Sequence, residues 1–212
     1  MRYYPVFLDI AGKPAVVIGG GDVAHQKVKG LLDAGAVVTI VSPELQPDLQ
    51  ALADEGRLRH VRRDYQRGDL DGCFLAFVAT DDRSINAGVA AEGKERGVLV
   101  NAVDDTPNCD FIMPAVTQRG RIIVAVSTSG TSPAMARKMR EELQAFLTED
   151  YALMLELAAE VRRELLQKQV MIPPDVWNAA LDADVKRLLG EGRRGEAKDR
   201  LLRGLLEPAA ER

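Results

Sequence analysis

Cysteine and histidine are scarce in this sequence, and long apolar runs are absent. Two cysteines, Cys73 and Cys109, cannot build the framework of several disulfides that stabilises small secreted domains. With only two histidines beside them, no His/Cys cluster has the spacing of a zinc site, so we predict no metal held by protein ligands. No segment approaches the roughly 18 to 20 apolar residues of a membrane helix, and the start of the chain lacks the apolar stretch of a signal peptide. We therefore expect a soluble, cytoplasmic protein.

An excess of positive charge is also absent. The formal net charge is −4, and basic and acidic residues balance each other after Tyr151. A nucleic-acid-binding face needs clustered Lys and Arg. We therefore expect a small-molecule partner, and neither nucleic acid nor a membrane. With 212 residues and 46% apolar content, the chain can bury one core of ordinary domain size and a smaller one.

A glycine-rich turn stands between an apolar run and a helical pattern. Residues 19–24, Gly-Gly-Gly-Asp-Val-Ala, directly follow the run Ala-Val-Val-Ile at 15–18. A tight turn out of a buried strand needs Gly19, close approach of a pyrophosphate needs a residue without a side chain at Gly21, and a small Ala24 lets the helix pack on the strand. The helix N-terminus then offers N–H groups to phosphates. The pattern predicts an NAD or NADP site; the alternative is a βαβ turn without a ligand.

One part of the dinucleotide fingerprint is missing. An Asp or Glu about 20 residues after the glycines usually binds the ribose hydroxyl of NAD, but Ser42 and Pro43 occupy this place. No Arg stands there for the 2′-phosphate of NADP, so the motif alone does not choose between the two cofactors. The predicted cofactor-binding residues are Gly19, Gly20, Gly21, Asp22, Val23, Ser42, Pro43 and Thr80.

Apolar runs alternate with helical patterns from residue 13 to about residue 104. Strands are expected at 15–18, 37–41, 58–61, 74–79 and 98–102, with helices between most of them. This alternation predicts an α/β fold with a Rossmann-type doubly wound parallel sheet, whose ligands bind beyond the carboxyl ends of the strands. We expect these ends to surround one crevice, formed by residues 19–23, 42–43, 80–82 and 103–105.

The pattern changes after the sheet. Residues 115–118 and 121–126 predict a β-hairpin, and a turn leads into a helix from Pro133 to about Leu147, with Ser132 as its N-cap. Amphipathic helices are expected at about 149–168 and 175–189, with a last one before Pro208. We predict three parts: an NAD-binding Rossmann domain (1–114), a small dimerisation and substrate module (115–147) and a helical C-terminal domain (148–212).

Six motifs together resemble the precorrin-2 dehydrogenases of sirohaem synthesis, over about residues 3 to 147. They are Pro5-Val6-Phe7-Leu8, the glycine turn, Ala79-Thr80-Asp81-Asp82, Asn101-Ala102-Val103-Asp104, Phe111-Ile112-Met113-Pro114 and the stretch from Val126 to Pro133. The resemblance implies NAD-dependent oxidation of precorrin-2 to sirohydrochlorin, and in some members also ferrous iron insertion by a ferrochelatase activity. Longer members carry a methyltransferase domain, for which the residues after Leu147 leave no room. The resemblance thus implies the standalone form, a homodimer built around the hairpin and helix.

The same resemblance assigns the site residues. Asp104 falls on the catalytic aspartate of the family, where a carboxylate can act as a base or stabilise a cationic intermediate; the alternative is an ordinary turn residue. The tetrapyrrole substrate carries several carboxylates, so its pocket needs cations and N–H donors. Our candidates are Ser127, Thr128, Ser129, Gly130, Arg119 and Arg137, with Arg121, Lys138 and Arg140 as further basic side chains. For each basic residue alone, a solvated surface position is the alternative.

Two other functions remain open from the sequence. One is a redox or ligand sensor that binds NAD or NADP without chemistry and signals through its helical tail. The other is a dehydrogenase of a different small anionic substrate. Neither the presence of iron insertion nor the role of the C-terminal helices follows from the sequence.

Overall fold

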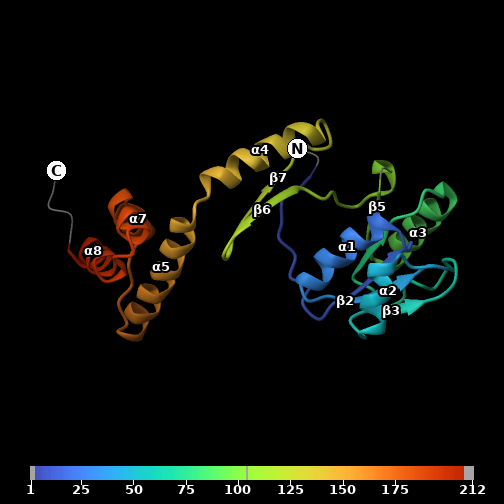
Figure 1. Ribbon diagram of the computed structural model, residues 1–212, viewed down its shortest axis with the longest axis horizontal. Helices are drawn as coiled ribbons and strands as arrows, with labels where there is room; N and C mark the ends of the chain where they lie inside the picture. The colour runs from blue at the N-terminus through green and yellow to red at the C-terminus, as the bar shows by residue number, and fades with distance from the viewer. Residues whose placement is uncertain (1–2, 104, 208–212) are drawn as a thin grey trace. The chain divides into compact units, whose positions relative to one another are not determined.

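The chain forms two compact units. The computed structural model describes residues 3–103 and 105–207 (Figure 1). The units comprise Met1–Met113 and Pro114–Arg212. Residues 115–147 and 148–212, which we predicted as separate parts, fall within the same unit, and the three-part division stays a prediction.

The first unit contains a five-stranded parallel sheet. Its strands are β1 (Pro14–Ile18), β2 (Val37–Val41), β3 (Arg59–Val61), β4 (Leu75–Val78) and β5 (Leu99–Ala102). They lie in the order β3-β2-β1-β4-β5, so the winding reverses between β3 and β4 and the switch point lies between β1 and β4. Ile18 pairs with both Val41 and Val78, which brings the carboxyl ends of the three central strands to the same level. The predicted doubly wound sheet is confirmed.

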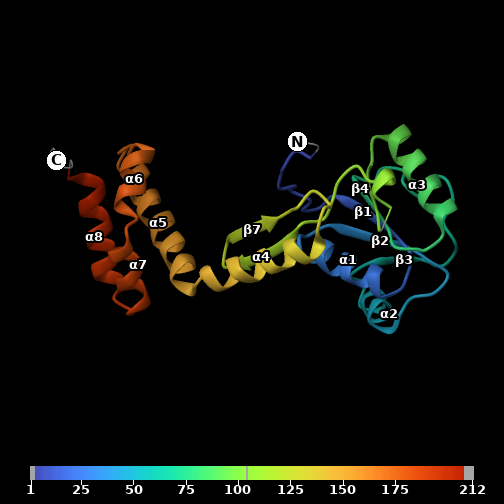
Figure 2. The same ribbon diagram turned by 90° about the horizontal axis from the view of Figure 1, so that it is seen from above.

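Helices cover both faces of this sheet (Figure 2). Alternate residues of β1 face opposite ways, and each set joins a different core. Ala15 and Val17 pack with buried residues of α1 (Asp22–Asp33) and α2 (Pro47–Asp54). Val16 and Ile18 pack with those of α3 (Arg83–Arg96). A sheet covered on both faces explains why its strands are continuous apolar runs in the sequence.

The second unit begins with a hairpin packed against a helix. The antiparallel strands β6 (Ala115–Arg119) and β7 (Ile122–Val126) follow the prediction, and α4 (Pro133–Phe146) contacts both. The hydroxyl of Ser132 accepts a hydrogen bond from the N–H of Met135 at 3.2 Å, so the predicted N-cap is confirmed. Thr117 and Val126 are buried, whereas Val116 and Ile123, on the opposite face of the hairpin, are 47% and 45% exposed.

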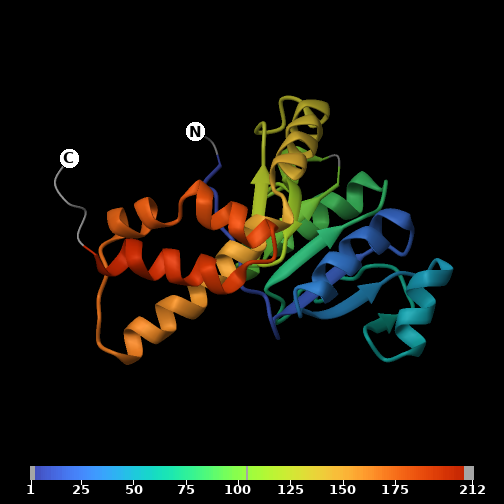
Figure 3. The same cartoon turned by 60° about the vertical axis from the view of Figure 1, so that its left-hand side comes forward.

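Four helices complete this unit and enclose a core of their own (Figure 3). They are α5 (Glu149–Gln167), α6 (Pro174–Ala180), α7 (Ala183–Gly190) and α8 (Arg194–Leu206), and their buried residues include Leu157, Val161, Leu188 and Leu201. The single helix predicted at 175–189 is wrong. The chain breaks there because the Asp182 carboxylate accepts a hydrogen bond from the N–H of Val185 and caps a new helix.

No helix in the described ranges is both long enough and apolar enough to cross a membrane.

Candidate functional site

A cavity of about 300 Å³ opens at the carboxyl ends of β1, β2 and β4. This is the crevice expected from the strand order, and its volume lies at the lower end of the range of small-molecule pockets. Residues from four loops, from the last positions of two strands and from the first turn of α3 surround it: Ile18, Gly19, Gly20, Val41, Ser42, Pro43, Asp64, Tyr65, Ala79, Thr80, Asp81 and Ile85.

Most of the predicted cofactor residues gather at this cavity. Gly19, Gly20, Ser42, Pro43 and Thr80 line it. The other three follow directly in the chain, where Gly21 is the N-cap of α1 and Asp22 and Val23 begin its first turn. Sequence reasoning missed Asp64 and Tyr65 altogether, because the connection between β3 and β4 carries no motif that marks it as part of the site.

The three glycines of the turn have different physical roles. Gly19 has φ of +114°, and a Cβ atom there would collide with the carbonyl oxygen of Ala79. A Cβ atom at Gly20 would collide with the carbonyl oxygen of Glu44. At Gly21, by contrast, a Cβ atom would find no protein atom within 4 Å. The first two glycines are therefore required by the fold, whereas the space at the third is available to a ligand.

The N-terminus of α1 suits an anionic ligand. The first hydrogen bond within α1 runs from the N–H of His25 to the carbonyl of Gly21, at 3.0 Å. The preceding N–H groups, those of Asp22, Val23 and Ala24, therefore have no acceptor within the helix. No side chain caps this end of the helix, and Ala24 is fully buried against the sheet. Bare backbone, unpaired N–H groups and the positive end of the helix dipole together fit the pyrophosphate of a dinucleotide.

Hydrogen bonds hold the loop after β2 against the glycine turn. The hydroxyl of Ser42 donates to the carbonyl of Glu44 at 2.7 Å, and the N–H of Gln46 donates to the carbonyl of Gly20 at 2.8 Å. From β3, His60 donates a hydrogen bond through Nε2 to the carbonyl of Ser42 at 2.9 Å. His60 thus positions a wall of the cavity, a role that the sequence did not indicate.

Tyr65 connects the cavity to a buried carboxylate. Its hydroxyl donates to Glu92, which is also bound by the N–H of Gly68 at 2.9 Å and by Nε of Arg96 at 2.7 Å. Partial burial and the bond to Glu92 both raise the pKa of the Tyr65 hydroxyl. The loop after β3 is therefore fixed to α3 by a charged hydrogen-bond network.

The predicted catalytic residue Asp104 lies outside the described residues. The segment after it is held closely to β5: the thiol of Cys109 donates to the carbonyl of Ala102 at 3.0 Å, and the amide of Asn101 donates to the carbonyl of Phe111 at 2.9 Å. Burial raises the pKa of the Cys109 thiol, which favours its protonated form. Asp105 accepts a hydrogen bond from the side chain of Asn108 at 2.8 Å.

The predicted substrate-binding residues belong to the second unit. Ser127, Thr128, Ser129 and Gly130 form the connection from β7 to α4, where the Thr128 hydroxyl donates to the carbonyl of Ser132 at 3.0 Å. The Ser127 hydroxyl accepts from the N–H of Ser129 at 3.1 Å. These bonds stabilise the turn, so helix capping accounts for part of its hydroxyl content.

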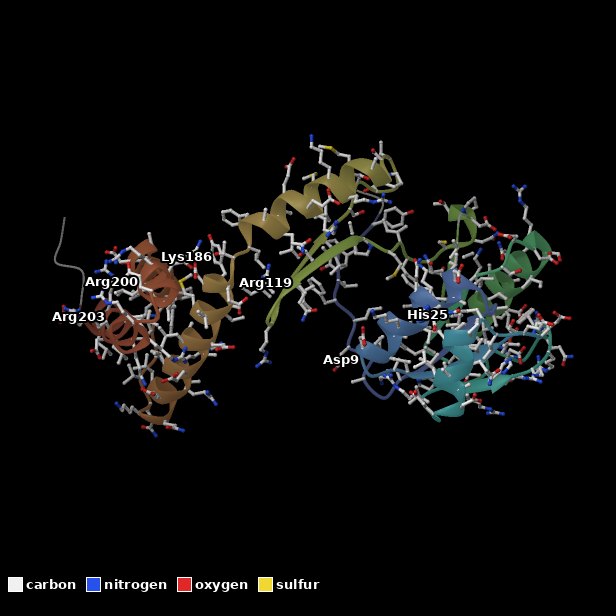
Figure 4. All side chains as sticks on the ribbon, in the orientation of Figure 1. Asp9, His25, Arg119, Lys186, Arg200 and Arg203 are labelled. Atoms are coloured by element: carbon white, nitrogen blue, oxygen red, sulfur yellow. The ribbon has the colours of Figure 1, made fainter. Side chains whose placement is uncertain are left out.

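The predicted basic side chains of the hairpin and of α4 differ in their surroundings, and Arg119 and Arg121 lie at the end of the hairpin opposite to Ser127. Arg119, which projects from β6 (Figure 4), donates to the carbonyl of Leu147 at 3.2 Å and lies 3.9 Å from Glu149. Arg140 binds Glu141 and Gln144. Arg137 is exposed on α4, as are Arg121 on the hairpin turn and Lys138. A role of any of them in binding substrate stays a prediction.

A second cavity, of about 330 Å³, lies between α1 and α2 and does not share residues with the first. It is lined by His25, Lys29, Asp48 and Arg57 among others, with 3.9 Å between His25 Nδ1 and the Asp48 carboxylate. His25 therefore faces α2 and not the glycine turn. Among the residues that the structure describes, no three or more His, Cys, Asp or Glu side chains form a group that could hold a metal ion.

Comparison with known proteins identifies two family segments. The family described as "Putative NAD(P)-binding" matches residues 6–115, and the one described as "Sirohaem biosynthesis protein central" matches residues 119–145. The first match includes all five strands of the parallel sheet. It confirms the prediction that this part of the chain binds a nicotinamide dinucleotide.

The chain is similar to curated proteins and to solved structures, among them two siroheme synthases and one dehydrogenase. The siroheme synthase of Photobacterium profundum is 38% identical over 204 residues, which is 95% of this chain and 44% of that protein. Siroheme synthase 1 of Serratia proteamaculans is 38% identical over 203 residues, covering 95% and 43%. The structure of "SirC, precorrin-2 dehydrogenase" matches with a TM-score of 0.77 and 27% identity, over 95% of this chain and 100% of SirC. The chain spans less than half the length of these siroheme synthases.

Proposed function

This chain belongs to the family described as "Putative NAD(P)-binding", and we propose that it catalyses the NAD-dependent dehydrogenation of precorrin-2 to sirohydrochlorin. The similarity to SirC supports this activity because it extends over the whole of that dehydrogenase. The observation that carries the proposal is the glycine turn at the cavity, where Gly21 leaves open space in front of the unpaired N–H groups of α1.

We propose that the cofactor is held by backbone more than by side chains. The N–H groups of Asp22 and Val23 bind the pyrophosphate beside the bare Cα of Gly21, Ser42 and Pro43 contact the adenosine half, and Thr80 lies on the path to the nicotinamide half. When bound, NAD supplies the acceptor for a hydride from the substrate. The hydrogen bonds from His60 to Ser42 and from Gln46 to Gly20 hold the cavity walls in place before the cofactor binds.

Asp104 is our proposed acid–base residue. Precorrin-2 loses two hydrogens in this oxidation, one as a hydride and one as a proton, and the proton needs an acceptor beside the ring. Asp104 follows β5, whose carboxyl end lies next to that of β4, and ligands of such sheets bind at these ends. Its carboxylate accepts the proton and stabilises positive charge on the macrocycle as the hydride leaves.

We further propose that the chain acts as a homodimer through its hairpin. One face of the two-stranded sheet is covered by α4, whereas Val116 and Ile123 on the other face are about half exposed. A two-stranded sheet with an uncovered apolar face is marginal in water. A second copy of this hairpin would cover the same residues on both chains, as a two-fold interface requires.

Spectroscopy tests the proposed activity directly. Precorrin-2 incubated with NAD and the protein should give the absorbance of sirohydrochlorin and one NADH per product. Binding of NAD without either signal would favour the sensor, and NADH formation with only other anionic substrates would favour a different dehydrogenase. Either result would overturn the proposal.

Ferrous iron insertion is the second activity that we propose to test, with the sirohydrochlorin produced in the same assay. The macrocycle supplies the nitrogen ligands for iron, so the protein needs only to accept the pyrrole protons, and Asp104 can do so. Faster loss of the metal-free spectrum with protein than without it would establish iron insertion, and equal rates would exclude it.

A further inference from the structure

The cofactor cavity contains acidic side chains and, among the residues that the structure describes, no basic ones. Asp64 and Asp81 line it, and every other lining residue is uncharged. NADP differs from NAD by a 2′-phosphate on the adenosine ribose, which carries about two negative charges at neutral pH. Sites that accept such a phosphate supply Arg or Lys to bind it. This cavity is therefore unfavourable for NADP.

Asp64 lies on the adenosine side of the cavity. It follows β3, which pairs with β2 through Val41 and Val61, and the N–H of Ser42 donates to the carbonyl of Val61 at 3.2 Å. The segment after β3 is thus adjacent to the end of β2, where an NAD site usually carries its acidic residue and this chain has Ser42 and Pro43. Asp64 lines the same cavity as these two residues, from the neighbouring strand.

The residues on both sides of Asp64 are anchored. The guanidinium of Arg63 donates to both oxygens of Asp69, at 2.6 and 2.8 Å, and to the carbonyl of Asp64 at 2.9 Å. Tyr65 is bound to Glu92. The position of Asp64 is therefore fixed before a ligand binds, which lowers the entropic cost of recognition.

The Asp64 carboxylate is available for a ligand, whereas the adjacent guanidinium of Arg63 is not. Nowhere in the described ranges does a group donate a hydrogen bond to the Asp64 carboxylate, and Arg63 is already engaged by Asp69 in a bidentate ion pair. Arg62 is exposed and is not a lining residue. A carboxylate accepts hydrogen bonds from vicinal ribose hydroxyls and repels a phosphate in the same place.

We propose that Asp64 selects NAD over NADP in this chain by binding the adenosine ribose from the end of β3, in place of the acidic residue that is absent from the end of β2. The inference rests on the proposed function only in that the cavity binds a dinucleotide; it does not depend on the substrate.

Direct binding tests the inference without requiring turnover. Dissociation constants for NAD and for NADP are measured by titration calorimetry on the full chain and on Asp64→Asn and Asp64→Arg. We expect the wild-type chain to prefer NAD by about tenfold or more, Asp64→Asn to lose most of this preference, and Asp64→Arg to prefer NADP. Asp48→Asn removes the same charge from the second cavity, which shares no residue with the cofactor cavity, and should leave the preference within about twofold of wild type.

The outcomes separate this inference from the proposed function. An unchanged preference in Asp64→Asn, with precorrin-2 still oxidised, overturns the role of Asp64 alone. A lost preference without any precorrin-2 oxidation by the wild type supports the role of Asp64 and overturns the proposed function. Equal wild-type affinity for both cofactors, or an equal loss of preference in Asp48→Asn, overturns the inference. Circular dichroism of each variant identifies a binding loss caused by misfolding, and Asp64→Glu, which keeps the charge, should then retain the preference for NAD.

Discussion

The hydroxyl of Tyr65 donates a hydrogen bond at 2.5 Å to the carboxylate of Glu92, whose side chain is fully buried in α3. A buried carboxylate is costly unless every oxygen is satisfied, and here the N–H of Gly68 and the guanidinium of Arg96 complete the set. Because Tyr65 lines the cofactor cavity, the charge buried under α3 also fixes one wall of the site.

Removal of the Tyr65 hydroxyl should reduce stability and change its pH dependence. Tyr65→Phe leaves Glu92 with one donor fewer and should lower the free energy of unfolding by about 1–3 kcal/mol at neutral pH. The pKa of Tyr65 is raised by burial and by Glu92, so its contribution is complete below the unfolded-state pKa of about 10 and is lost as pH rises above it. In urea unfolding, wild-type stability should therefore fall more steeply than that of Tyr65→Phe above this pH.

A matched control for this prediction is Tyr4→Phe, because Tyr4 is 86% exposed. The free energy of unfolding of Tyr4→Phe should equal that of the wild type at every pH. Parallel stability curves for the wild type and Tyr65→Phe would show that the bond to Glu92 contributes nothing to the pH dependence.

Substitutions in the glycine turn should separate folding from cofactor binding. Gly21→Val should lower the melting temperature by only a few degrees, because valine is a poorer N-cap than glycine but Gly21 has φ of −90° and free space around it, yet it should abolish NAD binding. Gly20→Ala should destabilise the fold, because its Cβ would collide with the backbone of Glu44. Calorimetry with NAD and thermal unfolding measure the two effects.

Gly30→Ala is the control for the glycine series. Gly30 lies within α1, and outside the backbone of its own helix no atom comes within 4 Å of the place where a Cβ atom would lie. Alanine should therefore stabilise the helix by about 0.5–1 kcal/mol. NAD affinity should not change in this variant. Normal NAD binding by Gly21→Val would place the cofactor elsewhere.

Replacement of Asp104 should abolish the chemistry and spare the cofactor. We expect Asp104→Ala to lose at least about a hundredfold in kcat for precorrin-2 oxidation, the usual size of a general-base contribution, while the dissociation constant for NAD is retained. Asp105→Asn serves as the comparison, because the Asp105 carboxylate already accepts a hydrogen bond from Asn108. This variant should retain most of the turnover. Undiminished turnover in Asp104→Ala would remove our catalytic assignment.

A charge on the open face of the hairpin should prevent dimerisation. Ile123→Glu places a carboxylate on the face of β7 that α4 does not cover, and sedimentation velocity should show a monomer where the wild type is a dimer. Leu166→Glu, at a residue of α5 that is 49% exposed, should leave the dimer intact. If both variants sediment as the wild type does, another surface forms the interface or the chain is a monomer.

Local sequence signals predicted much of this structure. The strands of the sheet and the N-cap at Ser132 each depend on residues close in the chain. The break at Asp182 was missed although its cap bond with Val185 is local, and only the structure shows that the same carboxylate also binds Arg200 of α8, which is remote in sequence. Asp64 and Tyr65 were missed because their place at the cavity depends on the pairing of β3 with β2 and on Glu92.

The smallest strand of the sheet does more than extend it. β3 has three residues and lies at the edge of the sheet. His60 in this strand donates a hydrogen bond to Ser42 in the loop after β2. The residues that follow β3 include Asp64 and Tyr65, which line the cavity. An insertion in β3 would disturb these ligand contacts while the other four strands remained paired. Correct folding of such a variant would therefore not show that it still binds its ligand.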